Sequence, residues 1–379
     1  MVGRSLVLID CLTSETRTAV VLDDSPVAFN VHPPAMSPRF GDVYAVRTRN
    51  VTGGGVFLEL GNGIDGFIPV HLLKGRSLGE GDLLLAEIRR EGVRGKGCRL
   101  APLDEPLPDG AQPGKVRAGD GPALEAIEWL DDDQIAEIRF EGIDQAMADM
   151  REEIVARRPA LSDRITRYTG ARPLFEAEAV DVHYWALDDP HMSLPGGGAL
   201  SIEPTAALVA IDIDSGPSSL TQANKAAVEA TCRAIRLRGL AGVMMIDPAG
   251  SNDRRQGFKM AEALETAFSA QRLEAEIKGV TRAGLVEIVR PMRREGIAAT
   301  LKRLRTRVYQ AFRAAHGAQA SAPGRAITIR ANVDFIELMS RDTFAPEREA
   351  YRARHGLDLR TEVDNAMARG VFEAVDQPI

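Results

Sequence analysis

The sequence contains little cysteine and no long apolar segment. Its three cysteines, Cys11, Cys98 and Cys232, are far apart and form no CxxC pair. This spacing offers neither a thiolate zinc site nor a disulfide framework, and it fits a reducing, cytoplasmic environment. No stretch of about 18 apolar residues occurs, so we expect no membrane-spanning helix. The first residues also lack the apolar stretch and cleavage site of a signal peptide.

An excess of positive charge is also absent. The formal net charge is -7, with 47 Lys and Arg against 54 Asp and Glu. Proteins that bind nucleic acids contact phosphates through Lys and Arg, so the overall charge argues against this class. The distribution of charge matters more than the sum, because residues 288–313, IVRPMRREGIAATLKRLRTRVYQAFR, are strongly basic. A solvated helix face and a nucleic-acid surface both remain open as explanations for this segment.

The pattern of apolar residues changes along the chain. Residues 39–102 contain short apolar segments separated by glycine-rich turns, which is typical of a small β-barrel. Residues 101–121, APLDEPLPDGAQPGKVRAGDG, are rich in Pro, Gly and Asp and predict a linker or a long loop. Residues 172–246 alternate between strand-like and helix-like segments, which indicates an α/β region.

Acidic residues end two strands of this α/β region. The apolar segments ALVAIDID (207–214) and GVMMID (242–247) flank an amphipathic helix, so they predict a βαβ unit with two parallel strands. Ligands bind outside the carboxyl ends of such strands, where Asp212, Asp214 and Asp247 stand. Clustered carboxylates suit a hard cation such as Mg²⁺. The alternative is that each aspartate caps the following turn. The spacing alone therefore predicts metal-assisted chemistry, with phosphates as one class of substrate.

Four ordered motifs follow one another from Tyr168 onward. They are YTGARPLF (168–175), LPGGGALSIEPTAALVAIDIDSG (194–216), NKAAVEATCRAIRLRGLAGVMMID (224–247) and TRAGLVEIVR (281–290). Together they resemble the motifs of the bacterial ribonuclease E/G family. The resemblance implies a Mg²⁺-dependent endoribonuclease that cleaves single-stranded RNA, either mRNA or an rRNA precursor, with Mn²⁺ as a possible substitute. It implies that Asp212 and Asp247 bind the metal, and that Asp214 stands at the position of a supporting Asn.

The barrel segment carries a second resemblance. The stretch GGVFLELGNGIDGFIPV (54–70) resembles the S1-type OB barrel that this family uses to bind RNA. The resemblance implies RNA contacts for Phe57, Phe67 and Lys96. Bases of a single strand stack on aromatic rings for about 1–3 kcal/mol each. The alternatives are that both phenylalanines belong to the barrel core and that Lys96 is an ordinary exposed turn residue.

Further cations occupy positions that the resemblance associates with RNA. Arg282 corresponds to a family residue beside the cleavage site, and Lys225 lies near the start of a family helix. Asn224 precedes Lys225, and capping of the helix is its simpler explanation. A basic rim beside the acidic edge is expected from Arg290, Arg293 and Arg294.

The resemblance implies a fold of the α/β class with several domains, in an α+β multidomain arrangement. We expect residues 1–36 and 103–185 to form a reduced ribonuclease-H-like domain, 37–102 an OB barrel, 186–295 a DNase-I-like catalytic domain and 296–379 a small C-terminal α/β domain.

Three departures from the family pattern affect the expected properties. The chain before Tyr168 is short, which predicts the loss of most of the ribonuclease-H-like domain and of its pocket for a 5′-monophosphate. There, Lys115 and Arg117 are the only cations of a segment expected to be mobile. The zinc-binding CPxC motif is absent, so we expect no zinc and a monomer or a simple dimer.

The third departure lies near the predicted metal ligands. Asp214 replaces an Asn, Ala206 replaces a Glu, and DPAGSND (247–253) differs from the family sequence. These changes leave an alternative open, in which the protein binds RNA but cleaves it weakly. A third possibility, a phosphoesterase acting on small nucleotides, would not need an RNA-binding barrel.

Overall fold

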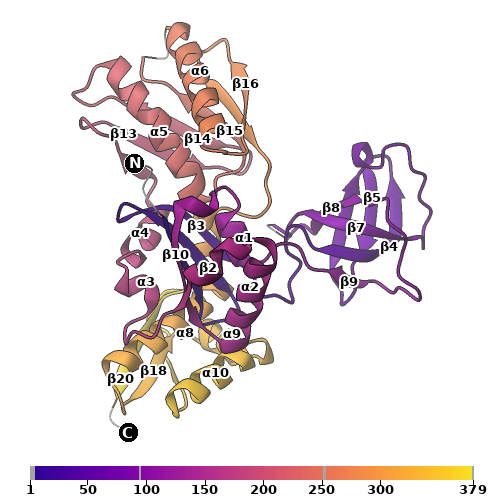
Figure 1. The fold of residues 1–379 in the computed structure, drawn as a ribbon, viewed down its shortest axis with the longest axis vertical. Coiled ribbons are helices and arrows are strands. Elements are labelled where there is room, and N and C mark those ends of the chain that lie inside the picture. Colours follow the sequence, from indigo (N-terminus) through magenta and orange to yellow (C-terminus); the bar gives the residue numbers. More distant parts are fainter. Residues whose placement is uncertain (1–4, 94, 251–252, 378–379) are drawn as a thin grey trace. The chain divides into compact units, whose positions relative to one another are not determined.

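A computed structural model describes residues 5–93, 95–250 and 253–377, and contacts between residues divide the chain into two units (Figure 1). The barrel unit comprises residues 33–121 and 292–295. The larger unit comprises residues 1–32, 122–291 and 296–379. The protein is a mixed α/β protein with an OB-like barrel, as the sequence predicts. Among the described residues, no helix is long and apolar enough to cross a membrane.

The barrel unit is built from short strands that close on themselves. Its strands are β4 (Val43–Thr52), β5 (Gly55–Glu59), β6 (Asp65–Pro69), β7 (Leu83–Arg90), β8 (Cys98–Pro102) and β9 (Gly114–Arg117). They pair in the order β5-β6-β8-β7-β4-β9, and β4 also pairs with β5, which closes the barrel. Alternate side chains such as Val56, Leu58 and Ile68 fill the interior.

The expected linker at residues 101–121 is wrong, because part of this segment is a strand. Strand β9 pairs with the first residues of β4, and the barrel unit extends to residue 121 rather than ending at 102. Lys115 lies on β9, where its Nζ is 2.6 Å from Asp42 Oδ2. The strand has four residues among Pro, Gly and Asp, so composition concealed it. Lys115 and Arg117 are therefore held on a strand rather than on a mobile loop.

The larger unit begins with a five-stranded sheet. Its strands are β1 (Ser5–Cys11), β2 (Thr16–Leu22), β3 (Ser25–His32), β10 (Ile135–Gly142) and β11 (Ile165–Arg167), in the order β11-β10-β1-β2-β3. Helices α1 (Pro122–Ile127) and α2 (Asp144–Arg157) share an apolar core with one face, and α3 (Leu174–Ala177) and α4 (Asp181–Trp185) share one with the other. The short chain before Tyr168 thus provides a five-stranded sheet, and apolar cores cover both of its faces.

The second sheet carries the predicted acidic strand ends. Its strands are β12 (His191–Ser193), β13 (Ala199–Pro204), β14 (Val209–Asp214), β15 (Gly242–Asp247), β17 (Val286–Arg290) and β16 (Glu276–Val280), paired in this order. Helices α5 (Leu220–Arg238) and α6 (Arg254–Ala270) cover one face (Figure 1). Helix α5 begins with a capping box between Ser219 and Gln222 and ends at Gly239, whose φ is 60°. Strands β14 and β15 are parallel, so the predicted βαβ unit is confirmed.

The C-terminal residues form a third, smaller sheet. Its strands are β18 (Ala326–Ala331), β19 (Arg360–Val363) and β20 (Phe372–Gln377), in the order β19-β18-β20. The accompanying helices are α8 (Leu304–Ser321), α9 (Val333–Ser340) and α10 (Ala345–His355), whereas the short α7 (Ile297–Leu301) before them packs into the core of the first sheet. Val308, Phe312 and Tyr351 form part of its apolar core.

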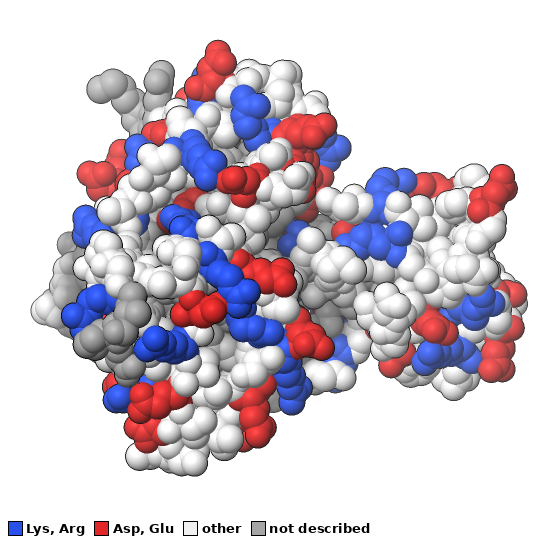
Figure 2. Space-filling model, turned by 90° about the horizontal axis from the view of Figure 1, so that it is seen from below, with Lys and Arg blue, Asp and Glu red and all other residues white. Residues whose placement is uncertain are grey.

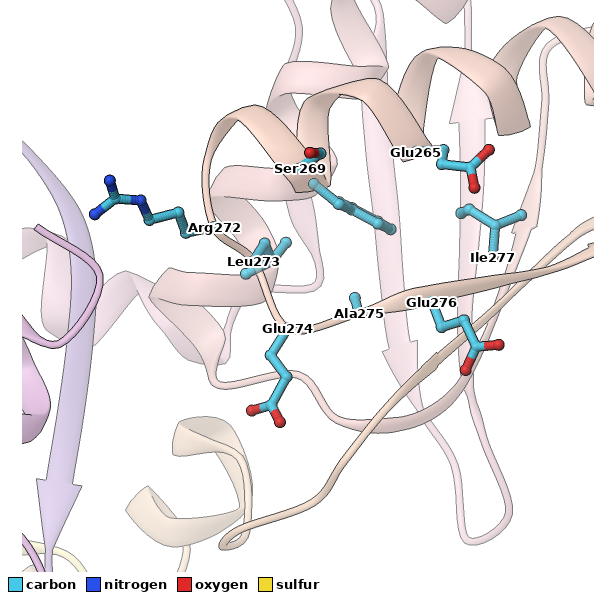
Figure 3. A pocket seen from close by; sticks show the side chains of 9 residues that line it. Glu265, Ser269, Arg272, Leu273, Glu274, Ala275, Glu276 and Ile277 are labelled. Carbon is cyan, nitrogen blue, oxygen red and sulfur yellow. The ribbon is translucent and has the colours of Figure 1, made fainter.

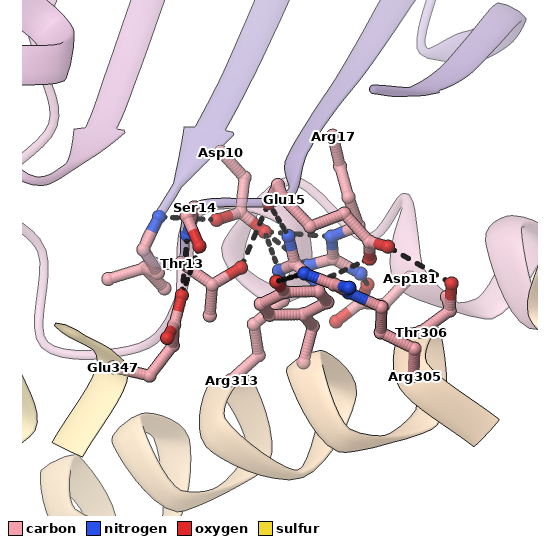
Figure 4. Close-up of polar contacts among 12 residues, drawn as sticks. Asp10, Thr13, Ser14, Glu15, Arg17, Asp181, Arg305, Thr306, Arg313 and Glu347 are labelled. Atoms are coloured by element: carbon pink, nitrogen blue, oxygen red, sulfur yellow. Dashed lines mark hydrogen bonds and ion pairs between the residues drawn. The ribbon is translucent and has the colours of Figure 1, made fainter. Parts of the chain in front are cut away.

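A buried ionic network joins helix α8 to the first sheet (Figure 4). Asp10, at the end of β1, accepts hydrogen bonds from Arg17 Nε at 2.7 Å and Arg313 Nε at 3.0 Å. Glu15 accepts from Arg313 Nη1 at 3.4 Å and from Thr306 Oγ1 at 3.0 Å. Burial alone would raise the pKa of Asp10, but Arg17 and Arg313 lower it. The network therefore ties the C-terminal helices to the first sheet through charges that have little access to water.

Candidate active site

The two predicted metal ligands lie side by side at the ends of parallel strands. Asp212 of β14 and Asp247 of β15 are direct partners in the register of the two strands. Their neighbours Ile211, Ile213 and Ile246 point into the apolar core, so both aspartates lie on the opposite face of the sheet. Adjacent strands are about 4.8 Å apart, so one ion can reach both carboxylates.

The surroundings of these carboxylates fit a cation. The Oδ1 atom of Asp247 is buried and has no hydrogen-bond partner among the described residues. Asp212 is exposed and likewise has no polar partner in the described part of the chain. A buried, unpaired carboxylate oxygen is unfavourable unless another group compensates it. A hard divalent ion would provide this compensation.

Asp214 is placed differently. Its Oδ1 accepts a hydrogen bond from the backbone N of Gly216 at 2.9 Å, so it caps the turn that leads into α5. The capping alternative therefore holds for Asp214. The described residues contain no group of three or more His, Cys, Asp or Glu side chains arranged to hold a metal. Asp212 and Asp247 are accordingly the residues that would hold Mg²⁺, an ion that usually keeps several water ligands.

Asn224 holds the segment that follows Asp247. Its Oδ1 accepts from the backbone N of Ala249 at 2.9 Å, and its Nδ2 donates to the carbonyl of Ala249 at 3.0 Å. The side chain is buried, whereas the N-cap of α5 is Ser219. The capping explanation for Asn224 is therefore wrong, because the N-cap lies five residues earlier. Ser251 and Asn252 belong to the stretch DPAGSND, which differs from the family sequence, and they lie outside the described residues.

The cations predicted around the site are only partly brought together. Arg282 is exposed in the turn between β16 and β17, and Val286 pairs with Ile246, so this turn lies at the same sheet end as Asp247. Lys225 is exposed near the start of α5. Arg290 instead pairs with Gly242 at the opposite end of β15, because β17 runs antiparallel to β15.

Arg293 and Arg294 belong to the barrel unit. The Arg294 side chain pairs with Glu91 at 3.2 Å, and the Arg293 guanidinium lies 4.6 Å from the ring centre of Phe40. The larger unit therefore does not carry the continuous basic rim predicted from Arg290, Arg293 and Arg294. On the face shown in Figure 2, Lys and Arg side chains are interspersed with Asp and Glu.

Two residues of α6 near this sheet end were not identified from the sequence. Phe258 is 53% exposed, and the Arg254 guanidinium lies 5.3 Å from its ring centre. Arg254 Nε also donates to the carbonyl of Thr281 at 3.2 Å, which links α6 to the turn of Arg282. A signal was present in the sequence, because Phe258 falls outside the apolar stripe of the helix. That stripe comprises Gly257, Met260, Leu264 and Phe268.

The aromatic residues of the barrel lie on its outer surface. Phe57 and Phe67 are direct partners on β5 and β6, and their ring centres are 5.0 Å apart. Phe57 is 48% exposed, so the core alternative is wrong for this residue. Arg99 of β8 pairs with Phe67 and extends the row, and it was not identified from the sequence. Lys96 is exposed in the turn before β8.

A second pair of carboxylates lies in the first sheet but is already neutralised. Asp10 and Glu141 are partners on the parallel strands β1 and β10, in the same arrangement as Asp212 and Asp247. Here Arg17 and Arg313 contact Asp10, and Arg354 Nη2 lies 3.3 Å from Glu141 Oε1. Arginine side chains contact these carboxylates where a metal ion would otherwise bind. We therefore assign this end of the first sheet a structural role rather than a catalytic one.

Glu141 makes the stability of the protein depend on pH. Burial, and then the charge of Asp10, raise the pKa of Glu141 to about 7. This folded-state pKa exceeds the unfolded value of about 4.3. The stability that Glu141 contributes is therefore fully present below about pH 4.3. It is lost as the pH rises through about 7.

We therefore expect the free energy of unfolding, taken relative to Glu141→Gln, to fall by about 3 kcal/mol between pH 4 and pH 8. Urea unfolding of both proteins across this range measures it. Burial lowers the pKa of His316 to about 3, but this group is present in both proteins, so its contribution cancels. Parallel curves for the two proteins would contradict the assignment.

A shallow hollow between the end of α6 and β16 carries no comparable chemistry. Figure 3 shows the charged ends of Arg272, Glu274 and Glu276 pointing away from one another. Arg272 makes two hydrogen bonds to Asp131, at 2.9 and 3.0 Å. The strand-end aspartates therefore remain the candidate site.

Comparison with known protein families agrees with these features. Residues 107–293 match the model of the ribonuclease E/G family, and residues 37–93 match that of the S1 RNA binding domain. Ribonuclease G of Escherichia coli (strain K12) is 29% identical over 151 residues, which are 38% of this chain and 31% of that protein. Ribonuclease E of Nostoc sp. is 33% identical over 116 residues, covering 28% and 17%.

Ribonuclease E of Escherichia coli (strain K12) is 31% identical over 141 residues, covering 35% of this chain and 13% of that protein. The chain therefore spans no more than 31% of the length of these relatives.

Proposed function

Because this chain belongs to the ribonuclease E/G family, we propose that it is an endoribonuclease that cleaves single-stranded RNA with a Mg²⁺ ion held by Asp212 and Asp247. The observation that carries this proposal is the pairing of these carboxylates in register, with a buried and unpaired oxygen on Asp247. Cleavage of an end-labelled single-stranded oligomer, with and without Mg²⁺, tests it directly. Mn²⁺ is expected to replace Mg²⁺, because it also accepts carboxylate and water ligands.

The residues around the site have distinct tasks in this proposal. Asp212 and Asp247 bind the ion, which when present polarises the phosphodiester and makes a bound water more acidic. Asn224 fixes the backbone that follows Asp247 through its two hydrogen bonds to Ala249. Arg282, on the turn at the same sheet end, supplies a cation for the RNA phosphates. Lys225 extends this contribution from α5.

The barrel binds the RNA in this proposal. Phe57 and Phe67 present a pair of adjacent aromatic rings on the surface, and Arg99 and Lys96 supply charge nearby. This combination suits single strands, whose bases stack while cations contact the backbone. Arg293 and Arg294 belong to the same unit, although their contacts with Phe40 and Glu91 reduce their availability.

Replacing Phe57 with Ala is expected to weaken RNA binding about 5- to 150-fold, which corresponds to the loss of about 1–3 kcal/mol of stacking. Fluorescence anisotropy with a labelled single-stranded oligomer measures the affinity. The matched control is Val70→Ala, which removes another exposed apolar side chain of the barrel, 52% exposed. Equal affinities of Phe57→Ala and the unmodified protein would argue against this surface.

We further propose that cleavage does not depend on the 5′ end of the RNA. Lys115 is paired with Asp42, and Arg117 makes two hydrogen bonds to Glu105 at 3.1 and 3.2 Å. Both cations thus already contact carboxylates, which would repel a terminal phosphate. RNAs with a 5′-monophosphate, 5′-triphosphate or 5′-hydroxyl end should react at rates within a few-fold of one another. A tenfold preference for the monophosphate would mean about 1.4 kcal/mol of specific recognition and would reject this part of the proposal.

The proposal extends to assembly and location. We propose a monomer or a simple dimer without zinc, acting in RNA processing in the cytoplasm, because the three cysteines are widely separated and each is buried. Elemental analysis and sedimentation measure the zinc content and the mass in solution.

A second candidate function is RNA binding with weakened cleavage. Asp214 favours it, because this residue adds a negative charge next to the metal ligands and could repel the scissile phosphate. Tight binding of the oligomer without Mg²⁺-dependent products would select this alternative.

A further inference from the structure

The two candidate metal ligands belong to a longer row of polar side chains. His191 of β12 pairs with Ser201 of β13, and Ser201 pairs with Asp212 of β14. Asp212 in turn pairs with Asp247 of β15. Four neighbouring strands thus contribute one polar residue each, in register, across the sheet.

These residues share the face of the sheet that α5 and α6 leave uncovered. The residues that alternate with them, such as Leu200, Ile202 and Ile211, belong to the apolar core beneath the helices. His191 and Asp212 are exposed, and Ser201 is half-buried. An RNA phosphate that reaches the aspartates from solvent therefore approaches a surface that also presents the histidine.

The imidazole of His191 lies against Ser201, its partner on β13. Its Nδ1 lies 3.1 Å from the hydroxyl of Ser201. The backbone N of His191 donates to Asp189 Oδ1 at 2.9 Å, which fixes the start of the strand. Nδ1 of the ring thus faces β13, and the exposed side chain has no other polar partner in the described part of the chain.

Hydrolysis of a phosphodiester needs a proton donor as well as a nucleophile. When water attacks phosphorus and the bond to the ribose 3′ oxygen breaks, the electron pair passes to that oxygen, which must gain a proton. Carboxylates that bind a metal are ionised and cannot supply it. Histidine is the side chain best suited to hold and release a proton near neutral pH.

We propose that His191 is the general acid of the cleavage reaction, an assignment that rests on the proposed function. Its protonated Nε2 donates to the departing 3′ oxygen, which becomes the 3′-hydroxyl of the upstream product, while the downstream product keeps the phosphate on its 5′ oxygen. The attacking water releases both of its protons to solvent, and the neutral imidazole takes one proton back from solvent. Ser201 is a positioning residue, which accepts from Nδ1–H of the imidazolium and fixes the ring so that Nε2 faces an RNA lying on this face of the sheet.

The test uses two RNA substrates that differ in one atom. One is ordinary RNA, and the other carries sulfur in place of the bridging 3′ oxygen at the cleaved bond. A thiolate leaves without a proton, because thiols are far more acidic than alcohols. For the ordinary RNA, His191→Ala should lower kcat about 10²- to 10⁴-fold, with little change in KM. For the sulfur-containing RNA, the kcat of His191→Ala should lie within about fivefold of that of the unmodified protein.

Each variant is compared with the unmodified protein on the same substrate. Any direct effect of sulfur on metal binding then changes both rates equally and cancels in their ratio. His183→Ala is the matched control, since His183 is exposed on α4 away from this row. It should leave both rates unchanged. Ser201→Ala should reduce kcat for ordinary RNA less than His191→Ala does, and it too should recover on the sulfur-containing RNA.

Three results would overturn the proposal. They are a rise in KM alone, an equal loss of rate on both substrates, and no loss on ordinary RNA. A rise in KM alone would mean that His191 binds the phosphate instead. If the unmodified protein cleaves neither substrate with Mg²⁺, the proposed function itself fails, which is a distinct outcome.

Discussion

Asp247→Asn should abolish Mg²⁺-dependent cleavage while leaving RNA affinity nearly intact. Asp247 is one of only two carboxylates in register at this sheet end, and its Oδ1 has no partner among the described residues. Asparagine keeps the shape of the side chain but removes the charge that holds the ion. Metal ions contribute several kcal/mol to such transition states, so we expect a loss of at least about a thousandfold in kcat. In the proposed function the barrel binds the RNA, so RNA affinity should change less than about threefold.

The metal itself gives a readout that does not depend on activity. A ligand that binds only the folded state raises its stability as the ligand concentration rises. Mg²⁺ should therefore raise the melting temperature of the unmodified protein and have little effect on Asp247→Asn. Without Mg²⁺, the variant should be at least as stable as the unmodified protein, because it no longer holds a buried charge that lacks a partner.

Asp214→Asn is the matched control. An asparagine oxygen can still accept from the backbone N of Gly216, so the turn before α5 is kept. This variant should fold, respond to Mg²⁺ and cleave RNA. Cleavage by Asp247→Asn within tenfold of the unmodified rate would rule out Asp247 as a metal ligand.

The acidic strand ends could be predicted because their position follows from local patterns. An apolar segment that ends in an acid, a helix and a second such segment make a βαβ unit, and this unit brings the two strand ends together. The outward direction of Phe57 follows from alternation as well, since its neighbours Val56 and Leu58 are core residues. The alternation of side chains along the strand thus shows that Phe57 lies outside the barrel core, which composition alone could not decide.

The sequence could not show that Arg290 lies away from the predicted basic rim, because proximity in the sequence does not give strand direction. Arg290 follows the Arg282 turn closely in the chain, but β17 carries it away from the aspartates along the length of β15. His191 gave no signal at all, since its strand has three residues and its role depends on register with three other strands. Features that depend on long-range pairing therefore required the structure.

The other large expected effect concerns Arg313, which we expect to be the most sensitive charged residue for stability. Arg313 is 5% exposed and contacts Asp10 and Glu15, which are 1% and 4% exposed (Figure 4). Arg313→Met keeps much of the apolar volume but leaves Glu15 without its principal cation. Removing one partner of a buried ionic group costs about 3–5 kcal/mol, so the free energy of unfolding should fall by this amount.

The dependence of this loss on pH distinguishes uncompensated charge from poor packing. Burial raises the pKa of Glu15, and Arg313 opposes that rise. Without Arg313, the folded-state pKa of Glu15 moves further above its unfolded value. The stability contributed by Glu15 is then complete below about pH 4 and is lost as the pH rises through the folded value. The deficit of Arg313→Met, measured by urea unfolding, should therefore shrink as the pH falls from 8 to 5, whereas a packing defect would give a constant deficit.

Arg352→Ala provides the control for this experiment. Arg352 lies on α10, and its ion pair with Asp358 is exposed to solvent, so its removal should cost no more than about 1 kcal/mol. A second variant separates the charge of Glu15 from the rest of the network. Adding Glu15→Gln to Arg313→Met removes the stranded carboxylate and should restore part of the stability at pH 8. If the double variant is less stable than Arg313→Met at every pH, the buried charge of Glu15 is not the source of the loss, and the network acts through its shape alone.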